Sequence, residues 1–209
     1  MSVTTRRRER EKEQRREIII DAAEALLCTK GRLSATMDDV AMEAEVSKGL
    51  LYKYFQSKDD LFEAVSLRAH GRLLALFREA VSADESGRHQ VSAIGRAYIA
   101  FASEYPVYFE ALVEHSTSEV SSDPESYSAL CERTADEILD LVRESIERGI
   151  ADGSIRGSLD PLQTAFMLWG ALHGLVVTAT FKNVLERHGQ YDQAFLNDSL
   201  KFLASCMKP

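Results

Sequence analysis

The chain has 209 residues, of which 45% are hydrophobic and 28% charged, and its formal net charge at pH 7 is -8. These values exclude a fibrous, collagen-like or wholly disordered chain and predict a globular protein of one or two domains. With only 4 prolines and 11 glycines, long helices are the expected elements, and no strand pattern of useful length is found. The predicted fold class is therefore all-α.

Cysteine content and the N-terminal sequence indicate the compartment. The three cysteines are far apart in the sequence: Cys28, Cys131 and Cys206. An odd, scattered set is neither a disulfide framework nor a zinc motif. The chain runs into Arg6 with no apolar secretory core, and its most apolar stretch, residues 165–181, is short for a membrane span. We predict a cytoplasmic protein without a membrane segment, a cofactor or a metal ion.

Charge is unevenly distributed along the sequence. Residues 1–60 contain 12 basic and 12 acidic side chains, whereas residues 61–209 contain 13 and 21. Within residues 6–17, seven basic side chains stand against four acidic ones. Because the field of such a cluster is local and is screened within about 10 Å, an acidic protein can still bind a polyanion through it. The overall acidity does not exclude DNA as a partner.

The first 30 residues predict a single helix. Apolar residues recur at helical spacing over 8–28 after a fully charged start, and Gly31 is expected to end the helix. The arginines of the charged start are Arg6, Arg7, Arg8 and Arg10. They either extend towards phosphates or an adjacent minor groove, or form only a solvated helix face.

Residues 36–55 predict two short helices joined by a three-residue turn, which is helix-turn-helix spacing. Thr36 stands three residues before Asp39, the pattern of a capping box, and Ser47 begins the second helix. The positive end of that helix favours phosphate. Gly49 lets its backbone approach a sugar or a base edge, because it has no side chain.

Longer helical patterns follow residue 57. The predicted helices cover residues 57–77, 91–104, 107–115, 126–151, 162–185 and 194–207. A polar break at residues 82–88 is the best candidate boundary, and a Ser-rich stretch covers residues 116–125. Asp160 followed by Pro161 is an N-cap with proline at the first helical position.

Three segments carry a family resemblance. They read Thr-Met-Asp-Asp-Val-Ala at residues 36–41, Val-Ser-Lys-Gly-Leu-Leu-Tyr-Lys-Tyr-Phe at 46–55 and Ser-Lys-Asp-Asp-Leu-Phe at 57–62. The sequence resembles the N-terminal DNA-binding domain of the TetR (tetracycline repressor-like) family of transcriptional regulators, over roughly residues 15–65. The resemblance implies a helix-turn-helix DNA-binding domain with a basic arm in residues 1–60. It also implies a larger helical domain for effector binding and dimerisation in residues 61–209.

Carried over position by position, the resemblance implies that Thr36 and Lys58 contact phosphates from the starts of their helices. The other predicted DNA-binding residues are Ser47, Lys48, Gly49, Leu50, Tyr52, Lys53 and Tyr54. Two positions depart from the family pattern. Glu45 stands where the family usually has glycine, and a left-handed conformation there costs about 1 kcal/mol with a side chain. Leu50 replaces a small polar residue and either packs inward or meets a thymine methyl group.

A cluster of aromatic residues in the second part suits a hydrophobic or aromatic effector. The candidate effector-binding residues are Phe101, Tyr105, Tyr108, Phe109, Leu112, His115, Phe166, Trp169 and His173. The alternative, for any one of them, is ordinary core packing.

Two helices near the C-terminus offer a dimer interface. Gly170, Gly174 and Thr178 are four residues apart and leave a smooth stripe, and Phe195, Ser199 and Phe202 lie on the last helix. Two such helices from each chain would form a four-helix interface. Packing within one chain is the alternative.

Together these features predict a repressor that binds a palindromic operator in double-stranded DNA as a homodimer and is released by a small-molecule effector. The alternative is a DNA-bound scaffold that acts through a protein partner without a small effector. An enzyme built on Glu110, Glu114 and His115 is disfavoured, because no catalytic serine or cysteine motif, phosphate loop or two-histidine metal motif accompanies them.

Overall fold

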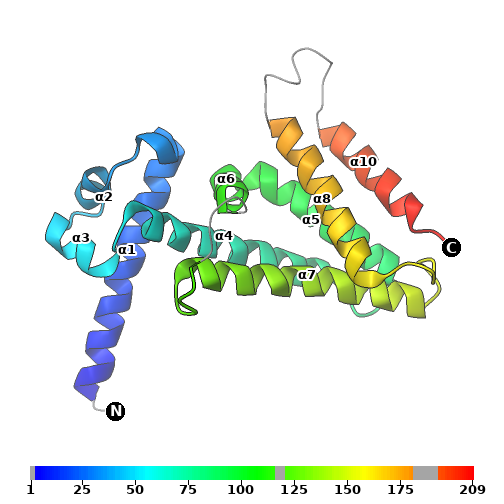
Figure 1. Cartoon of the computed structure of the whole chain (residues 1–209), viewed down its shortest axis with the longest axis horizontal. Helices are drawn as coiled ribbons and strands as arrows, with labels where there is room; N and C mark the ends of the chain where they lie inside the picture. Colours follow the sequence, from blue (N-terminus) through cyan, green and yellow to red (C-terminus); the bar gives the residue numbers. More distant parts are fainter. Residues whose placement is uncertain (1–2, 116–120, 181–192) are drawn as a thin grey trace. The chain divides into compact units, whose positions relative to one another are not determined.

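The computed structural model describes residues 3–115, 121–180 and 193–209. Within these ranges every regular element is an α-helix, which confirms the all-α fold class (Figure 1). The helices are α1 (Val3–Ser34), α2 (Met37–Glu43), α3 (Lys48–Tyr54), α4 (Lys58–Ala80), α5 (Gly87–Glu104), α6 (Pro106–His115), α7 (Tyr127–Ala151), α8 (Pro161–Thr180) and α10 (Gln193–Cys206). The parts of the predicted helix 162–185 and of the polar stretch 116–125 that fall at 181–185 and 116–120 lie outside the described residues.

Helix starts follow the predicted capping residues. The Thr36 hydroxyl accepts a hydrogen bond from the Asp39 N–H at 3.1 Å, and the Asp39 carboxylate accepts one from the Thr36 N–H at 3.0 Å, so the capping box is present. The Ser47 hydroxyl accepts from the Leu50 N–H at 3.2 Å at the start of α3. Asp160 caps α8 in the same way, by accepting the N–H three residues later at 2.8 Å. These local signals position the short helices.

The first helix is longer than predicted at both ends. It begins at Val3 rather than near residue 8, and continues to Ser34 beyond Gly31. Gly31 adopts φ 71° and ψ 161°, so the helical path is interrupted at the residue that was expected to end it. The charged residues before residue 8 remain helical because nothing in their sequence breaks the pattern.

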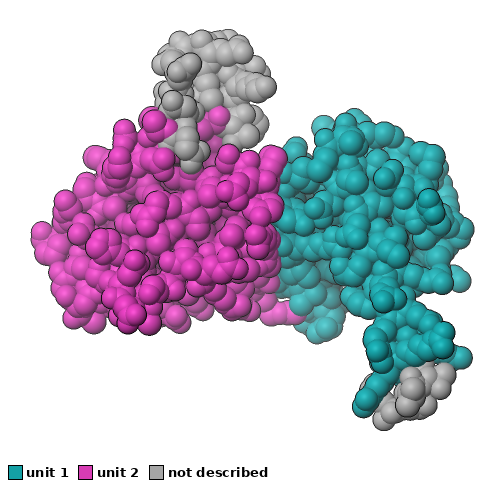
Figure 2. All heavy atoms as spheres, turned by 180° about the vertical axis from the view of Figure 1, so that it is seen from behind, with its two compact units in different colours: residues 1–70, 107–132 teal, residues 71–106, 133–209 magenta. Residues whose placement is uncertain are grey.

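The chain forms two compact units (Figure 2). Unit 1 consists of residues 1–70 and 107–132, and unit 2 of residues 71–106 and 133–209. The functional division predicted at residue 60 falls within α4 (Lys58–Ala80), and it stays a prediction.

The core of unit 1 fixes the helix-turn-helix. Leu51 and Phe55 are fully buried together with Val40, Leu61 and other apolar residues of α1, α2 and α4. Phe55 also stacks on the Tyr127 ring with 5.9 Å between the ring centroids. Burying an apolar side chain of this size contributes about 1.5–3 kcal/mol, so this apolar face anchors α3 and leaves its other face to solvent.

An ion-pair network joins α1 to α4 and α6 within unit 1. The Arg68 guanidinium donates to the carboxylates of Glu17, of Asp21 at 2.6 Å and of Glu24 at 3.3 Å. The Tyr108 hydroxyl donates to Glu24 at 2.9 Å. Burial disfavours the charge on Arg68, but the hydrogen bonds to Glu17 and Asp21 outweigh it and raise the pKa of this group. The network therefore holds a permanent positive charge against α1.

In unit 2, α10 packs against α5 and α8. The backbones of α5 and α7 touch, because a Cβ placed on Gly87 would lie 2.0 Å from the backbone nitrogen of Gly149. A Cβ on Gly95 would lie 2.4 Å from a methyl group of Leu200. The backbone contact requires glycine at position 87, whereas a side chain at position 95 would require the Leu200 side chain to move.

The turn between α2 and α3 contains the expected strain. Glu45 adopts φ 52°, in the left-handed region that favours glycine. A Glu45→Gly variant is expected to raise the free energy of unfolding by about 1 kcal/mol, because it removes the Cβ clash of that conformation. Urea denaturation followed by circular dichroism measures the change. The matched control is Glu43→Gly, in the exposed last turn of α2, which should lower it by about the same amount. If both substitutions changed the free energy of unfolding in the same direction, this explanation would be contradicted.

Candidate nucleic-acid interface

The outward face of α3 carries four of the predicted DNA-binding residues. Lys48, Gly49, Tyr52 and Lys53 are all exposed, and their i, i+1, i+4, i+5 spacing places them on one side of the helix. The opposite side is anchored by Leu51, which is fully buried. The structure thus brings these side chains to a single solvent-facing surface.

The remaining residues of α3 flank that surface. Leu50 and Tyr54 are half-buried, and Tyr54 packs against the core of unit 1. The half-buried Leu50 side chain keeps part of its surface accessible, and its contact with a thymine methyl group stays a prediction. A Cβ placed on Gly49 meets no atom within 4 Å. The fold does not require glycine there, so the open backbone is available to a ligand.

Thr36 and Lys58 already have partners within the chain. The Thr36 hydroxyl donates to Asp39 at 2.8 Å, and the Lys58 ammonium donates to the Leu33 carbonyl at 3.4 Å and lies 5.7 Å from the Phe62 ring centroid. Hydrogen bonds from Lys30 and then from Thr36 lower the pKa of Asp39 to about 2. Contact between these two residues and phosphate would require exchange of the present contacts.

The basic segment is helical. Residues 5–15 are all exposed, and Arg7 forms an ion pair with Glu11 at 2.8 Å. Its arginines therefore lie on a solvated helix, and contact with DNA stays a prediction.

The nine predicted effector-binding residues are divided between the units. Unit 1 contains Tyr108, Phe109, Leu112 and His115, and unit 2 contains Phe101, Tyr105, Phe166, Trp169 and His173. A small pocket in unit 1, next to Arg32 and Phe62, is lined by none of the nine. The nine residues therefore do not form one cavity within either unit, and helical periodicity in the sequence could not reveal this division.

Within unit 2, two aromatic stacks involve these residues. Phe101 is fully buried and stacks on Tyr105 with 5.6 Å between centroids. Trp169 stacks on His173 at 5.3 Å, and the Tyr98 hydroxyl lies 2.6 Å from His173 Nδ1. Trp169 and Phe166 are about half exposed, at 49% and 51%. Their predicted role in effector binding therefore has an alternative, which is a role in an interface at the protein surface.

The predicted dimer face is open in the single chain. Gly170, Gly174 and Thr178 are exposed, and a Cβ on either glycine meets no atom within 4 Å. Phe195 and Ser199 are half-buried, whereas Phe202 is exposed. Beside the stripe, α8 also exposes large apolar side chains: Leu162, Phe166, Met167 and Trp169. An exposed apolar surface of this kind is typical of interaction sites, and a dimer through this face stays a prediction.

Helix α8 also passes a length and composition test for a membrane span. Pro161–Ala179 has a mean hydropathy of 1.3, and 22% of its most apolar window is buried. Both exposed residues, such as Leu162, and buried residues, such as Leu172 and Val176, contribute to this hydropathy.

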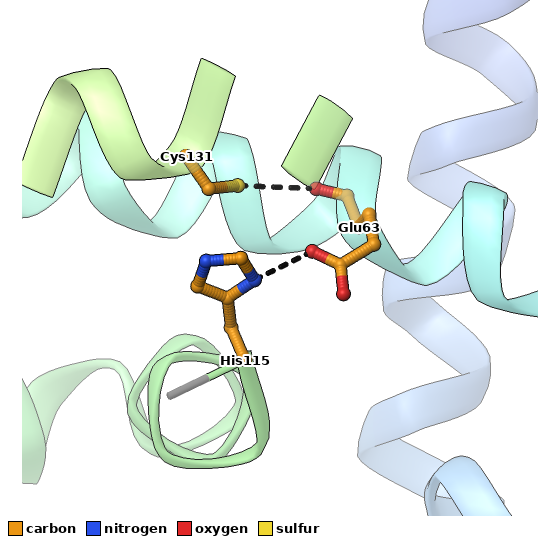
Figure 3. Close-up of side chains that lie close together, drawn as sticks. All are labelled: Glu63, His115 and Cys131. Atoms are coloured by element: carbon orange, nitrogen blue, oxygen red, sulfur yellow. Dashed lines mark hydrogen bonds and ion pairs between the residues drawn. The ribbon is translucent and has the colours of Figure 1, made fainter. Parts of the chain in front are cut away.

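Sequence reasoning missed a polar cluster in unit 1. The Glu63 carboxylate lies 2.7 Å from His115 Nδ1, and the Cys131 thiol donates to the Glu63 backbone carbonyl at 3.6 Å (Figure 3). The hydrogen bond to Glu63 raises the pKa of His115, and burial raises the pKa of the Cys131 thiol. These residues are 52 and 16 positions apart, so no local motif could have revealed the cluster.

Comparison with known families identifies both parts of the chain. The profile of bacterial regulatory proteins of the tetR family matches residues 19–65. The profile of the tetracyclin repressor-like C-terminal domain matches residues 91–200, which is more than half of the chain. The chain belongs to the TetR family.

TetR-family proteins are DNA-binding transcriptional regulators and not enzymes, so the comparisons give no support to an enzyme. An uncharacterized HTH-type transcriptional regulator of Mycobacterium tuberculosis is 32% identical over 117 residues, 56% of this chain and 50% of the relative. The chain thus spans about half the length of that relative. The HTH-type transcriptional regulator UidR of Escherichia coli is 25% identical over 158 residues, 76% of this chain and 78% of UidR.

Solved structures confirm the TetR fold over nearly the whole chain. A TetR/AcrR-family transcriptional regulator from Thermobifida fusca has a TM-score of 0.71 and 18% identity, with 91% of this chain and 97% of that chain covered. The transcriptional regulator FadR from Bacillus subtilis, in complex with stearoyl-CoA, has a TM-score of 0.70 and 20% identity, with 90% and 97% covered.

The exposed face of α3 contains an ion pair with α2 that has a testable consequence if this face binds DNA, as the TetR resemblance predicts. Lys48 Nζ lies 2.6 Å from an Asp38 carboxylate oxygen, and both side chains are exposed. The hydrogen bond that Lys48 donates to Asp38 raises the pKa of Lys48. In an Asp38→Asn variant, Lys48 is free for phosphate and a negative charge near the DNA is gone. We expect severalfold tighter DNA binding at low salt, and a smaller gain at high salt.

Fluorescence anisotropy with labelled duplex DNA at two salt concentrations measures this effect. The matched control is Glu137→Gln, which removes the partner of Arg78 in a similarly exposed pair away from the predicted DNA-binding and dimer residues. Weaker binding by Asp38→Asn would show that Asp38 supports the interface rather than competing for Lys48.

Proposed function

We propose that this TetR-family protein is a cytoplasmic transcriptional repressor that binds a palindromic operator as a homodimer and is released from it by a small apolar or aromatic effector. The observation that carries the proposal is the polar, exposed face of α3 on a helix whose other face is anchored by fully buried Leu51.

The chemistry of α3 suits a duplex. Lys48 and Lys53 supply cationic donors for phosphate, and the Tyr52 hydroxyl supplies a neutral donor and acceptor. Leu50, at the margin of the surface, can contact a thymine methyl group. Phosphate contacts fix the orientation of the helix, and contacts with base edges provide the sequence preference.

The exposed apolar face of α8 supports a homodimer. One recognition helix reads few base pairs, whereas a two-fold pair reads two half-sites about 34–36 Å apart. A self-complementary patch is the simplest way to cover an apolar face, because the same surface is used twice. The accessible glycines Gly170 and Gly174 allow a partner helix to approach closely.

The helical body supports a small-molecule effector. A structural neighbour, FadR of Bacillus subtilis, was solved in complex with stearoyl-CoA. In this chain, unit 2 contains the Phe101–Tyr105 stack, in which Phe101 is fully buried, and the polar pair of Tyr98 and His173. An effector releases DNA only if it binds the two conformations unequally, and a hundredfold difference corresponds to nearly 3 kcal/mol.

Selection of bound DNA from a random pool tests the DNA-binding part. Wild type is expected to enrich a palindrome, whereas Lys48→Ala and Tyr52→Ala lose the enrichment, because both side chains are exposed on α3. Lys201→Ala, exposed on α10, is the matched control and should keep it. No enriched motif from folded wild type would overturn the proposal.

Two further measurements test the remaining parts. By thermodynamic reciprocity, an effector that weakens DNA binding must itself bind more weakly to the DNA complex, so titrations with acyl-CoA thioesters should show mutual changes in affinity. Genomic mapping separates a repressor, with sites clustered in promoters, from a DNA-bound scaffold with sites spread over the chromosome.

A further inference from the structure

Three side chains from different helices converge inside unit 1 (Figure 3). They are Glu63 of α4, His115 at the end of α6 and Cys131 of α7, and all three are buried. A ligand atom from each lies within 4.8 Å of the other two. A carboxylate oxygen, an imidazole nitrogen and a sulfur thus share one small volume.

An ion pair accounts for only part of this arrangement. Glu63 and His115 satisfy each other at 2.7 Å, which offsets the free energy of burying a charged carboxylate. The thiol contributes little to such a pair, because its own hydrogen bond, to the Glu63 carbonyl, is weak. The common property of the three groups is that each binds transition metal ions.

We propose that Glu63, His115 and Cys131 bind a divalent transition metal ion of the zinc class. Zinc takes thiolate, imidazole and carboxylate ligands in four-coordinate sites, and it tolerates small shifts of its ligands since it has no electronic preference for geometry. Side-chain rotations within the present cluster would bring the three atoms to coordination distance.

The surrounding groups suit a metal site. His115 Nδ1 faces Glu63, and its Nε2 lies 3.2 Å from a carboxylate oxygen of Glu132. With the ion on Nδ1, Glu132 would accept the hydrogen bond from Nε2–H that orients ligating histidines. His70, whose ring centroid is 5.2 Å from that of His115, is held through Nδ1 by the Ser66 carbonyl at 2.8 Å. The three side chains leave the fourth position of a four-coordinate ion to a water molecule, because His70 is not among the residues whose ligand atoms converge.

The charge balance also favours a divalent ion. A carboxylate, a neutral imidazole and a thiolate together carry a charge of about -2, which a divalent ion neutralises, so the ion adds no uncompensated buried charge. Ligands must be deprotonated to bind, so binding of Zn²⁺ releases the thiol proton, and any proton on the imidazole, to solvent.

An ion at this site would join α4, α6 and α7 within unit 1. Because α4 follows α3 after a short connection, we expect metal binding to change the affinity for DNA. This last expectation, unlike the site itself, rests on the proposed function.

Cobalt(II) titration of the metal-free full-length protein tests the site. Wild type is expected to bind one Co²⁺ per chain with a sulfur-to-cobalt charge-transfer absorption, which Zn²⁺ abolishes by displacement. Cys131→Ser should lose this absorption. Cys28→Ser and Cys206→Ser are the matched controls, because both thiols are exposed and outside the cluster, and they should keep it.

A second variant avoids the buried core. Glu132 is about half exposed, and Glu132→Gln should fold normally and bind Co²⁺ about 10–100-fold more weakly, as expected for a group that orients a ligand. Glu144→Gln, exposed on the same helix, is its control. A wild-type protein without the charge-transfer absorption, or an absorption unchanged by Cys131→Ser, would overturn the proposal.

Failure of the site and failure of the proposed function are distinguishable. The cobalt absorption requires no DNA, and DNA selection can be done with metal-free protein. Charge-transfer absorption without any selected motif would retain the site and reject the DNA-binding function, whereas the opposite result would leave Glu63 and His115 as a structural ion pair.

Discussion

A Gly49→Ala variant is expected to unfold at higher urea concentration than wild type and yet to bind DNA at least about tenfold more weakly. Alanine in place of glycine inside a helix adds about 1 kcal/mol of stability, and a Cβ at Gly49 meets no atom of the chain within 4 Å. Any loss of DNA binding must therefore come from contact between the new methyl group and the duplex. This contact would keep the backbone of α3 away from the DNA.

Urea denaturation and anisotropy titrations measure the two effects on the same preparation. Gly71→Ala is the matched control, because Gly71 lies in α4 and is also exposed with open space around its Cβ. The control should gain stability and bind DNA unchanged. Undiminished DNA binding by Gly49→Ala would mean that the backbone of α3 stays at a distance from the DNA.

A Gly174→Glu variant is expected to be monomeric and to bind operator DNA about a hundredfold or more weakly. The side chain would place a charge in the middle of the stripe formed by Gly170, Gly174 and Thr178, where a partner helix is proposed to approach closely. In a dimer, binding of one subunit to its half-site raises the effective concentration of the other subunit at the second half-site. Loss of this effect in a monomer lowers the affinity about 10²–10⁴-fold.

Light scattering coupled to size-exclusion chromatography gives the oligomeric state. The single chain has room for the new side chain, so circular dichroism should be that of wild type. Gly71→Glu introduces the same charge at another exposed glycine and should remain dimeric. A dimeric Gly174→Glu protein would place the interface on another surface.

Capping residues made the short helices predictable. Thr36, Ser47 and Asp160 act through backbone groups three residues away, so the sequence contains both partners of each contact. The left-handed conformation of Glu45 was predictable from the family resemblance, because the family usually has glycine at this position.

Residues that meet only in the tertiary structure were not predictable. Helical spacing places Phe166 and Trp169 on α8, but exposure depends on what packs against that helix, and both side chains are about half exposed. Glu63, His115 and Cys131 come from three helices whose crossing angles are set by many apolar contacts. The sequence therefore predicted the recognition helix better than the polar cluster.

The first turns of α1 do not bury side chains against the rest of the chain in residues 5–15. Residues 5–15 are exposed throughout, so this segment is stabilised by its own backbone hydrogen bonds and by pairs such as Arg7–Glu11. Isolated helices of about 12–15 residues are marginal in water, and local opening requires little free energy where no side chain is buried. Amide protons here should exchange with deuterated solvent long before those of the helix-turn-helix, and slower exchange in the presence of a duplex would report directly on an arm that becomes ordered against it.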